Sequence, residues 1–173
     1  MPLPYNSIYM PTYSASGLEF ISRAPDQTRR LGFRLGSLLH PGDVIALSGD
    51  LGSGKTTFVQ GIAQGWGSTD AVSSPTFVLV NVYRRPDGGL LHHMDAYRMQ
   101  NALEAEDLDI EEMLATGALL VEWPERIQAA LPQECLRVEL AWVADEQRSM
   151  IFTPVGKRSE ELSREFKKLA FGG

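Results

Sequence analysis

The feature that most constrains this chain is the glycine-rich segment at residues 49–56, whose letters GDLGSGKT fit the pattern G-x-x-x-x-G-K-[ST] at every fixed position. An almost wholly apolar run at residues 44–47 precedes it, and such a run is typical of a strand buried on both faces of a parallel sheet. Apolar residues follow at helical spacing in residues 56–66. The sequence therefore predicts a strand, a phosphate-binding loop and a helix in direct succession, as in an α/β fold.

A loop of this kind binds phosphate because small residues let successive backbone N–H groups point inward, and the following helix adds its positive N-terminal end. We expect Lys55 to bridge the β- and γ-phosphates of a nucleotide and the Thr56 hydroxyl to ligate Mg²⁺. The alternative is a glycine-rich turn that matches by chance, and the flanking strand and helix argue against it. The residues predicted to contact the nucleotide are Asp50, Leu51, Gly52, Ser53, Gly54, Lys55, Thr56 and Thr57.

A P-loop also needs a carboxylate at the end of a neighbouring strand, which holds the metal or its water. Glu122 follows the apolar run at residues 118–121, and Asp95 follows the predicted strand at residues 90–94. The alternative for Glu122 is a surface acid near a helix N-terminus, and the alternative for Asp95 is an ion pair with Arg98. Spacing alone leaves both interpretations open for each carboxylate.

Several other polar or aromatic residues lie near these motifs. His92 and His93 are adjacent, so in a strand they face opposite sides and cannot easily chelate one ion; packing or surface roles are predicted for both. Residues 73–76 lie between the P-loop helix and the next strand, where a switch loop would sit, although a simple turn is the commoner explanation of Ser-Ser-Pro-Thr. Trp123 is expected in the core or at the rim of the site.

The rest of the chain supports an α/β, P-loop NTPase-like three-layer fold with a mainly parallel central sheet plus an antiparallel hairpin, flanked by helices. We expect a poorly ordered leader at residues 1–17 and a single P-loop domain at residues 18–173. The predicted strands are residues 18–22, 44–47, 77–83, 90–94, 118–121, 137–143 and 150–155. The predicted helices start near Pro25, Thr56, Ala102 and Pro124, with a last one marked by Leu162, Phe166 and Leu169.

The composition excludes several classes of protein. Cys135 is the only cysteine, so an intramolecular disulfide and a cysteine-based zinc or iron–sulfur cluster are ruled out. No apolar run approaches the ~18 residues that a membrane helix needs, and the first residues do not resemble a signal peptide, which predicts a cytoplasmic protein without membrane contact. The net charge of −6 argues against an extended grip on bare nucleic acid, including DNA.

Four strings, GDLGSGKTTF, SPTFVLV, HMDAYR and VEWPERI, occur in this order and at intervals that resemble the bacterial TsaE (YjeE) family. The resemblance extends from about Leu18 to Val155. It implies a P-loop ATPase of the machinery that installs threonylcarbamoyl on the adenosine beside the tRNA anticodon. It also implies that Lys55 and Thr56 bind phosphate and Mg²⁺, that Glu122 completes the metal site, and that Asp95 is needed for hydrolysis.

The resemblance further implies ATP and Mg²⁺ as cofactors and TsaB and TsaD as protein partners, with tRNA reached only through their complex. Three positions depart from the family pattern. Ser53 replaces the commoner Ala in the P-loop, Ala96 replaces Leu in the HxDxYR string, and Asp109 stands where Gly is common after the acidic helix. Arg148 is a loose match to an arginine near the nucleotide in relatives.

Two other functions compete with this one. A small-molecule kinase would need an arginine-rich lid, and the pair Arg84 and Arg85 lies instead in a predicted hairpin turn. A nucleotide-dependent binding module with incidental turnover is the non-enzyme alternative, and the sequence does not exclude it. A GTPase is disfavoured because neither N-K-x-D nor D-x-x-G occurs in the chain.

Overall fold

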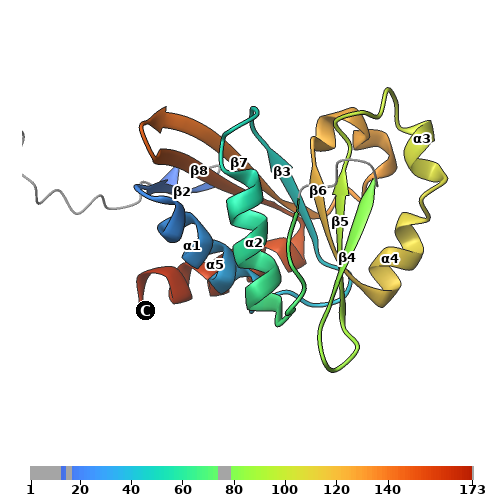
Figure 1. Cartoon of the computed structure of the whole chain (residues 1–173), viewed down its shortest axis with the longest axis horizontal. Coiled ribbons are helices and arrows are strands. Elements are labelled where there is room, and N and C mark those ends of the chain that lie inside the picture. The colour runs from blue at the N-terminus through green and yellow to red at the C-terminus, as the bar shows by residue number, and fades with distance from the viewer. Residues whose placement is uncertain (1–12, 15–16, 74–78, 173) are drawn as a thin grey trace, which may run out of the picture.

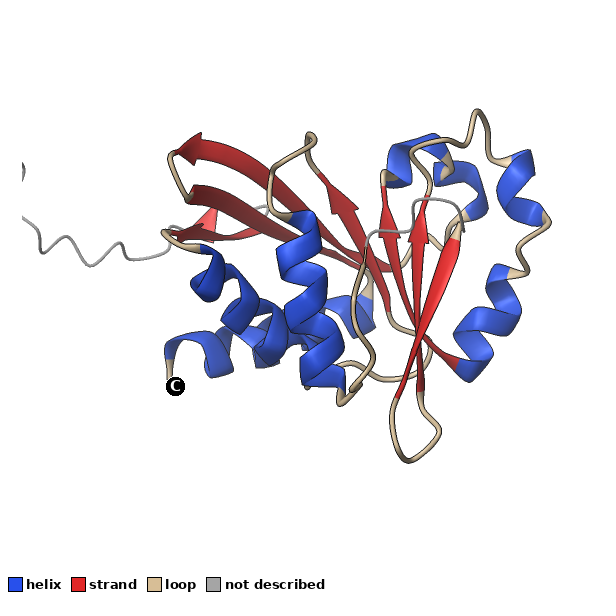
Figure 2. Cartoon of the chain, viewed as in Figure 1, coloured by secondary structure: helices blue, strands red, loops and turns tan. Residues whose placement is uncertain are grey.

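The computed structural model of the chain describes residues 13–14, 17–73 and 79–172, and in this part all strands join one eight-stranded sheet. Helices cover the sheet on both faces, which gives three layers (Figures 1 and 2). The α/β three-layer fold predicted from the sequence is confirmed.

Parallel strands form the middle of the sheet. The strand β3 (Val44–Ser48) lies between β6 (Gly117–Glu122) and β7 (Cys135–Ala144) and is parallel to both, and β5 (Leu90–Asp95) is parallel to β6. Every residue of β6 is buried, as expected for a strand covered on both faces. The carboxyl ends of β3, β5 and β6 therefore meet at one edge of the sheet, where open α/β sheets bind their ligands.

Antiparallel strands extend this centre on both sides. The predicted hairpin is formed by β4 (Val80–Arg84) and β5. On the other side β8 (Gln147–Val155) pairs with β7, followed by β2 (Gly17–Ser22) and the short β1 (Tyr13–Ser14). The order along the sheet is β1-β2-β8-β7-β3-β6-β5-β4.

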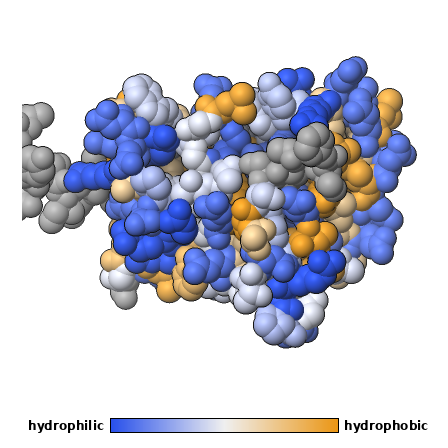
Figure 3. Space-filling view, viewed as in Figure 1, coloured by the Kyte–Doolittle hydropathy of each residue, from blue (hydrophilic) through white to orange (hydrophobic). Residues whose placement is uncertain are grey.

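Three helices cover one face of the sheet: α1 (Pro25–Gly36), α2 (Lys55–Trp66) and α5 (Lys157–Phe171). Each is amphipathic and buries its apolar side in one large cluster with alternate residues of the strands, such as Ile45 and Leu47 of β3. In the space-filling view of Figure 3, hydrophilic residues gather over the region of α1, and hydrophilic, neutral and a few hydrophobic residues mix over the region of α2. The packing fixes α2 against the end of β3, where the P-loop begins.

Shorter helices cover the other face. The helices α3 (Leu103–Glu106) and α4 (Ile110–Thr116) lie where the sequence predicted helical structure from Ala102 onward. The single helix predicted from Pro124 onward is wrong, because the chain forms two short 3₁₀ helices, η1 (Pro124–Arg126) and η2 (Gln128–Ala130). Ile127 between them is fully buried in the cluster under α3 and α4, and its backbone leaves the helical region, with φ −132°, to reach that position.

Part of the expected organisation falls outside the described residues. Of the leader predicted at residues 1–17, only Tyr13, Ser14 and Gly17 are described, and of residues 73–76 only Ser73. Among the described helices none is both long and apolar enough to cross a membrane.

Candidate functional site

The P-loop leaves the carboxyl end of β3 and enters α2 through Gly54, the residue before the first helical turn. Gly49 has a left-handed φ of 142°, and a Cβ there would lie 2.3 Å from the carbonyl oxygen of Leu140, so the loop can pass β7 only without a side chain. Gly52 has φ 80°, and a Cβ there would meet no atom within 4 Å. The backbone at Gly52 therefore faces open space, which suits a bound phosphate.

Lys55 is nearly buried, with 6% of its surface exposed, although it starts an outer helix. Its Nζ donates to the carbonyl oxygens of Gly49 and of Asp50, the latter at 3.0 Å. The ammonium therefore folds back onto the backbone at the start of the P-loop. Burial lowers the pKa of Lys55 below its ordinary value of 10.5, and the nearby carboxylates of Glu122 and Asp95 oppose that shift. The predicted lysine and both predicted carboxylates therefore share one electrostatic environment.

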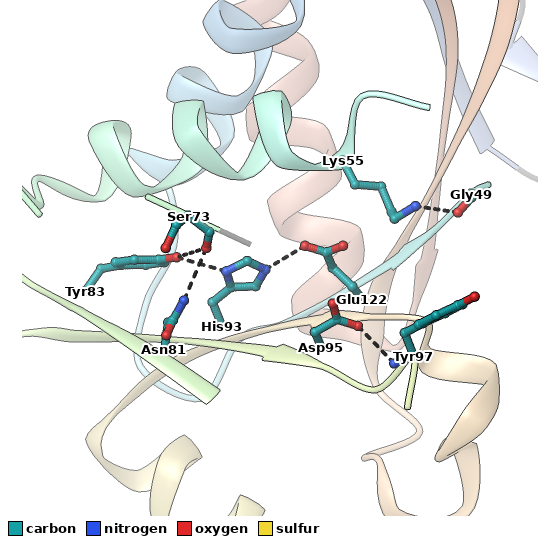
Figure 4. A network of polar contacts seen from close by, with 9 residues as sticks. All are labelled: Gly49, Lys55, Ser73, Asn81, Tyr83, His93, Asp95, Tyr97 and Glu122. Atoms are coloured by element: carbon teal, nitrogen blue, oxygen red, sulfur yellow. Dashed lines mark hydrogen bonds and ion pairs between the residues drawn. The ribbon is translucent and has the colours of Figure 1, made fainter. Parts of the chain in front are cut away.

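Asp95 and Glu122 are the last residues of β5 and β6, and they lie opposite each other in the parallel register. Glu122 is only 5% exposed, so it is not the surface acid of the alternative interpretation. The described residues contain no ion pair between Asp95 and Arg98. The sheet thus brings both carboxylates to the edge where the P-loop begins, on the side that Lys55 reaches (Figure 4).

Burial raises the pKa of the Asp95 carboxyl above its ordinary value of 3.8. A hydrogen bond of 2.9 Å from the Tyr97 backbone N–H to Oδ1 counteracts this rise, whereas the negative charge of Glu122 adds to it. Two carboxylates that repel each other and face one buried ammonium form a site that a further cation would stabilise.

His93 belongs to this site, although the sequence suggested only a packing or surface role for it. Its ring is fully buried, with Nε2 2.7 Å from Oε1 of Glu122 and Nδ1 3.0 Å from the Tyr83 hydroxyl (Figure 4). The signal that could have found it is the interval of two residues between His93 and Asp95, which places both on the same face of a strand. His92 faces the other side, as expected, and contacts Thr116 Oγ1 at 3.1 Å.

Aromatic residues form the rim of the site. Trp123 follows Glu122 directly and has a left-handed φ of 57°, a rare conformation for a bulky residue. Its ring lies 4.8 Å from Lys55 Nζ and 5.0 Å from the ring of Tyr97, and the Arg126 guanidinium lies over Tyr97 in turn. Trp123 is partly buried: its ring lies over the ammonium at the rim of the site, and the residue also packs against the core cluster that contains Val121 and Ile127.

Two buried polar atoms beside the P-loop have no hydrogen-bond partner among the described residues. They are Oγ of Ser53, which is 2% exposed, and Nε of Arg148, a residue of β8 whose side chain would touch a Cβ at Gly54. A polyphosphate in the loop would offer acceptors to such donors. The residues present therefore fit an anionic ligand at this position.

A metal ion needs more ligands than the protein alone supplies. Within the described ranges no group of three or more His, Cys, Asp or Glu side chains could hold an ion. Mg²⁺ in nucleotide sites is bound by one or two protein groups and by phosphate oxygens and water. The hydroxyl residue Thr56 in the first turn of α2 and the carboxylates of Glu122 and Asp95 at the strand ends fit that pattern, and they do not fit a metal site independent of the nucleotide.

The arginine pair that a kinase lid would require lies elsewhere. Arg85 packs over the ring of Trp66 at 4.1 Å and bonds Asp87 in the hairpin turn. Trp66 is the last residue of α2, whereas the P-loop adjoins the first residue of this helix. Because a helix of 12 residues is ~18 Å long, Arg85 lies about that far from the P-loop. Figure 1 shows the hairpin at the end of the molecule opposite the P-loop. Arg84 and Arg85 therefore cannot close over the phosphates.

Comparisons with known proteins agree with this arrangement. The family model described as threonylcarbamoyl adenosine biosynthesis protein TsaE matches residues 22–150. The tRNA threonylcarbamoyladenosine biosynthesis protein TsaE of Bacillus subtilis is 43% identical over 146 residues, which cover 83% of this chain and 90% of that protein. The protein of the same name from Streptomyces coelicolor is 43% identical over 136 residues, covering 75% and 92%. The crystal structure of Bacillus subtilis YdiB superposes with a TM-score of 0.74 at 35% identity, covering 88% of this chain and 95% of that one.

Proposed function

The chain belongs to the TsaE family of tRNA threonylcarbamoyladenosine biosynthesis proteins, and we propose that it serves that role as a Mg²⁺-dependent ATPase. The observation that carries the proposal is the meeting of Lys55, Asp95 and Glu122 at the mouth of the P-loop, from three separate elements. Residues 18–173 would act as one ATPase domain.

In this proposal the backbone of residues 50–54 and the first turn of α2 bind the phosphates, with Thr57 beside them. Lys55 exchanges its contacts with the loop carbonyls for the β- and γ-phosphate oxygens, so that the ammonium stays partnered throughout. Its place under the Trp123 ring keeps water away from this charge, which strengthens the attraction between lysine and phosphate.

The groups proposed to hold the ion are the Thr56 hydroxyl and the carboxylates of Glu122 and Asp95, directly or through water. Bound Mg²⁺ would neutralise charge on the β- and γ-phosphate oxygens as the terminal phosphate leaves. The Tyr97 N–H holds Asp95 at Oδ1, and the other oxygen of this carboxylate would hydrogen-bond the water that attacks the terminal phosphate. Asp95 is thus proposed to align that water and to accept its proton.

ATP hydrolysis measured with the protein alone, with TsaB and TsaD, and with small-molecule acceptors tests this proposal. Release of inorganic phosphate that depends on Mg²⁺ and needs no acceptor is expected. Transfer of the phosphate to a small acceptor would indicate a kinase instead. A protein that binds ATP but stays inert with and without its partners would be a binding module.

We also propose that TsaB and TsaD receive the effect of ATP through protein contact, and that tRNA is reached only through them. The net charge of −6 disfavours tight independent binding of tRNA. Binding to the TsaB–TsaD pair is expected to be at least ~5-fold tighter with a non-hydrolysable ATP analogue than with ADP, the low end of usual coupling between sites. Asp95→Ala should keep this docking but fail to support repeated rounds of tRNA modification. Equal affinity in both nucleotide states would rule out the coupling.

A further inference from the structure

We propose that His93 is a positioning residue that fixes the orientation of Glu122, and that Tyr83 holds His93 in turn. The proposal rests on the proposed function, because it assigns to Glu122 the part of a carboxylate that acts on Mg²⁺. Four separate parts of the chain meet in this network: Glu122 ends β6, His93 lies in β5, Tyr83 lies in β4, and Ser73 lies in the segment after α2.

The imidazole is held on both sides. Nε2 lies 2.7 Å from Oε1 of Glu122, and an ionised carboxylate can only accept, so Nε2 carries the hydrogen of this bond. Nδ1 lies 3.0 Å from the Tyr83 hydroxyl, which accordingly donates to it when the ring is neutral. Since both nitrogens are engaged and the ring is fully buried, the imidazole cannot flip or rotate without breaking a hydrogen bond.

The Tyr83 hydroxyl is fixed as well. Tyr83 is 3% exposed, and its ring centroid lies 5.9 Å from that of His93. Its hydroxyl also lies 3.3 Å from the carbonyl oxygen of Ser73, so its single hydrogen is shared between this carbonyl and Nδ1 of a neutral His93. The same carbonyl accepts from Asn81 Nδ2 at 3.2 Å. The backbone at Ser73 is thus tied, through one tyrosine and one histidine, to a carboxylate at the P-loop (Figure 4).

These contacts determine the orientation of the Glu122 carboxylate. A glutamate side chain has three rotatable bonds, and its carboxylate could point in several directions from the end of β6. The hydrogen bond to Oε1 fixes the carboxylate plane and with it the direction of Oε2. Groups that orient a metal-binding side chain in this way usually contribute 10–100-fold to metal affinity or activity.

The strand offers a matched control one residue away. His92 is also a largely buried histidine of β5, 7% exposed, but its Nε2 contacts Thr116 on the opposite face of the sheet. A general requirement for a packed histidine in β5 would make both positions sensitive. A positioning role toward Glu122 makes only His93 sensitive.

The experiment compares His93→Leu, His93→Gln, Tyr83→Phe and His92→Leu in the full-length protein. The measurements are kcat and KM for ATP, the affinity of the protein–ADP complex for Mn²⁺ by electron paramagnetic resonance, and the melting temperature. His93→Leu should lower kcat and Mn²⁺ affinity ~10–100-fold, with ADP affinity in the absence of metal within ~2-fold. His93→Gln can place an amide N–H near the position of Nε2 and should recover most of the loss. Tyr83→Phe should lose ~3–10-fold, and His92→Leu should match the wild type.

Combination with Glu122→Ala separates positioning from an independent role. If His93 acts through Glu122, the double variant His93→Leu/Glu122→Ala is no slower than Glu122→Ala alone. Two results would overturn the inference. In the first, the fold-losses in kcat of the two single variants multiply in the double variant. In the second, His93→Leu, His93→Gln and Tyr83→Phe are all folded and all keep the wild-type kcat and Mn²⁺ affinity. A wild-type protein without ATP turnover would refute the proposed function instead, and Mn²⁺ binding by the same variants still decides the role of His93.

Discussion

Two buried carboxylates at opposite ends of the parallel strands have different surroundings. Asp43, just before β3, is 6% exposed and accepts from Arg158 at both oxygens, at 2.9 and 2.8 Å, and from the His40 backbone N–H at 2.8 Å. Glu122, at the end of β6, is 5% exposed and is held at Oε1 by the imidazole of His93. Asp43 has a dedicated guanidinium, whereas Glu122 faces an ammonium that bonds to the loop carbonyls.

The difference separates a carboxylate that holds the fold from one suited to bind a ligand. Arg158 joins α5 to the start of β3 by a two-point contact that satisfies both charges permanently. Among the described residues no guanidinium forms an ion pair with the two carboxylates at the other end, and burial raises the pKa of Asp95 there. The following variants test whether the two ends differ in function as they do in structure.

Lys55→Ala is expected to have the largest effect. ATP hydrolysis should fall by ~10³ or more, because the main positive charge on the phosphates is lost from a site shielded from water. The helix should remain, since the apolar side of α2 lies elsewhere and the contacts that disappear are those of the ammonium to Gly49, Asp50 and the Trp123 ring. Phosphate release and circular dichroism measure the two quantities. Normal turnover by a folded Lys55→Ala protein would disprove the phosphate site.

Glu122→Ala should lower turnover by ~10² or more while nucleotide affinity stays within about tenfold. One proposed metal ligand is lost from a site held mainly by phosphate contacts. Steady-state kinetics at saturating Mg²⁺, with ADP affinity measured by calorimetry, checks both values. Wild-type rates at saturating Mg²⁺ would remove Glu122 from the metal site.

Asp43→Ala should show the reverse pattern, a loss of stability without a loss of chemistry. Removing one partner of a buried ion pair costs ~3–5 kcal/mol, and the partial exposure of Arg158 reduces the expected loss in the free energy of unfolding to ~2 kcal/mol. Urea denaturation measures this, and kcat per folded molecule should stay within ~2-fold. The double variant Asp43→Ala/Arg158→Met should regain part of the stability. A large fall in kcat with unchanged stability would show that the two ends are not distinct.

Much of this contrast follows from local patterns in the sequence. The P-loop, the buried strands and both carboxylates at strand ends could be predicted because each depends on residues close together in the chain. Asp109 is an example, since the family resemblance leads one to expect Gly there. The residue has a left-handed φ of 50°, and its side chain accepts from Glu112 N at the start of α4. Asp tolerates this backbone, and the position keeps its geometry.

The remainder depends on contacts between distant segments. The strand order places Tyr83, His93 and Glu122 on neighbouring strands, and no local period indicates which strands become neighbours. The ion pair between Asp43 and Arg158 could not be predicted from the sequence for the same reason. The helix predicted after Pro124 failed because a tertiary contact, the burial of Ile127, outweighed local helix preference.

The smallest predicted effect concerns the pH dependence of stability through Asp95. The folded protein holds the Asp95 proton more tightly than the unfolded chain, since burial raises the pKa of this carboxyl. Stability from this group is therefore greatest below the ordinary pKa of 3.8 and is lost as pH rises through the folded value. Asp95→Asn removes the charge and keeps an oxygen for the Tyr97 N–H, so at pH 7 it should unfold with ~0.5–1 kcal/mol more free energy than the wild type.

Urea denaturation of both proteins between pH 4 and pH 7, without nucleotide, measures this difference, which should grow as pH rises. In the same variant Mg²⁺ with a non-hydrolysable ATP analogue should raise the melting temperature less than in the wild type, because a ligand stabilises a protein in proportion to its affinity for the folded state. An Asp95→Asn protein that is less stable than the wild type at pH 7 would mean that the Asp95 charge supports the fold, as the charge of Asp43 does. The carboxylates at the two ends of the strands would then have different contacts, but both would stabilise the fold.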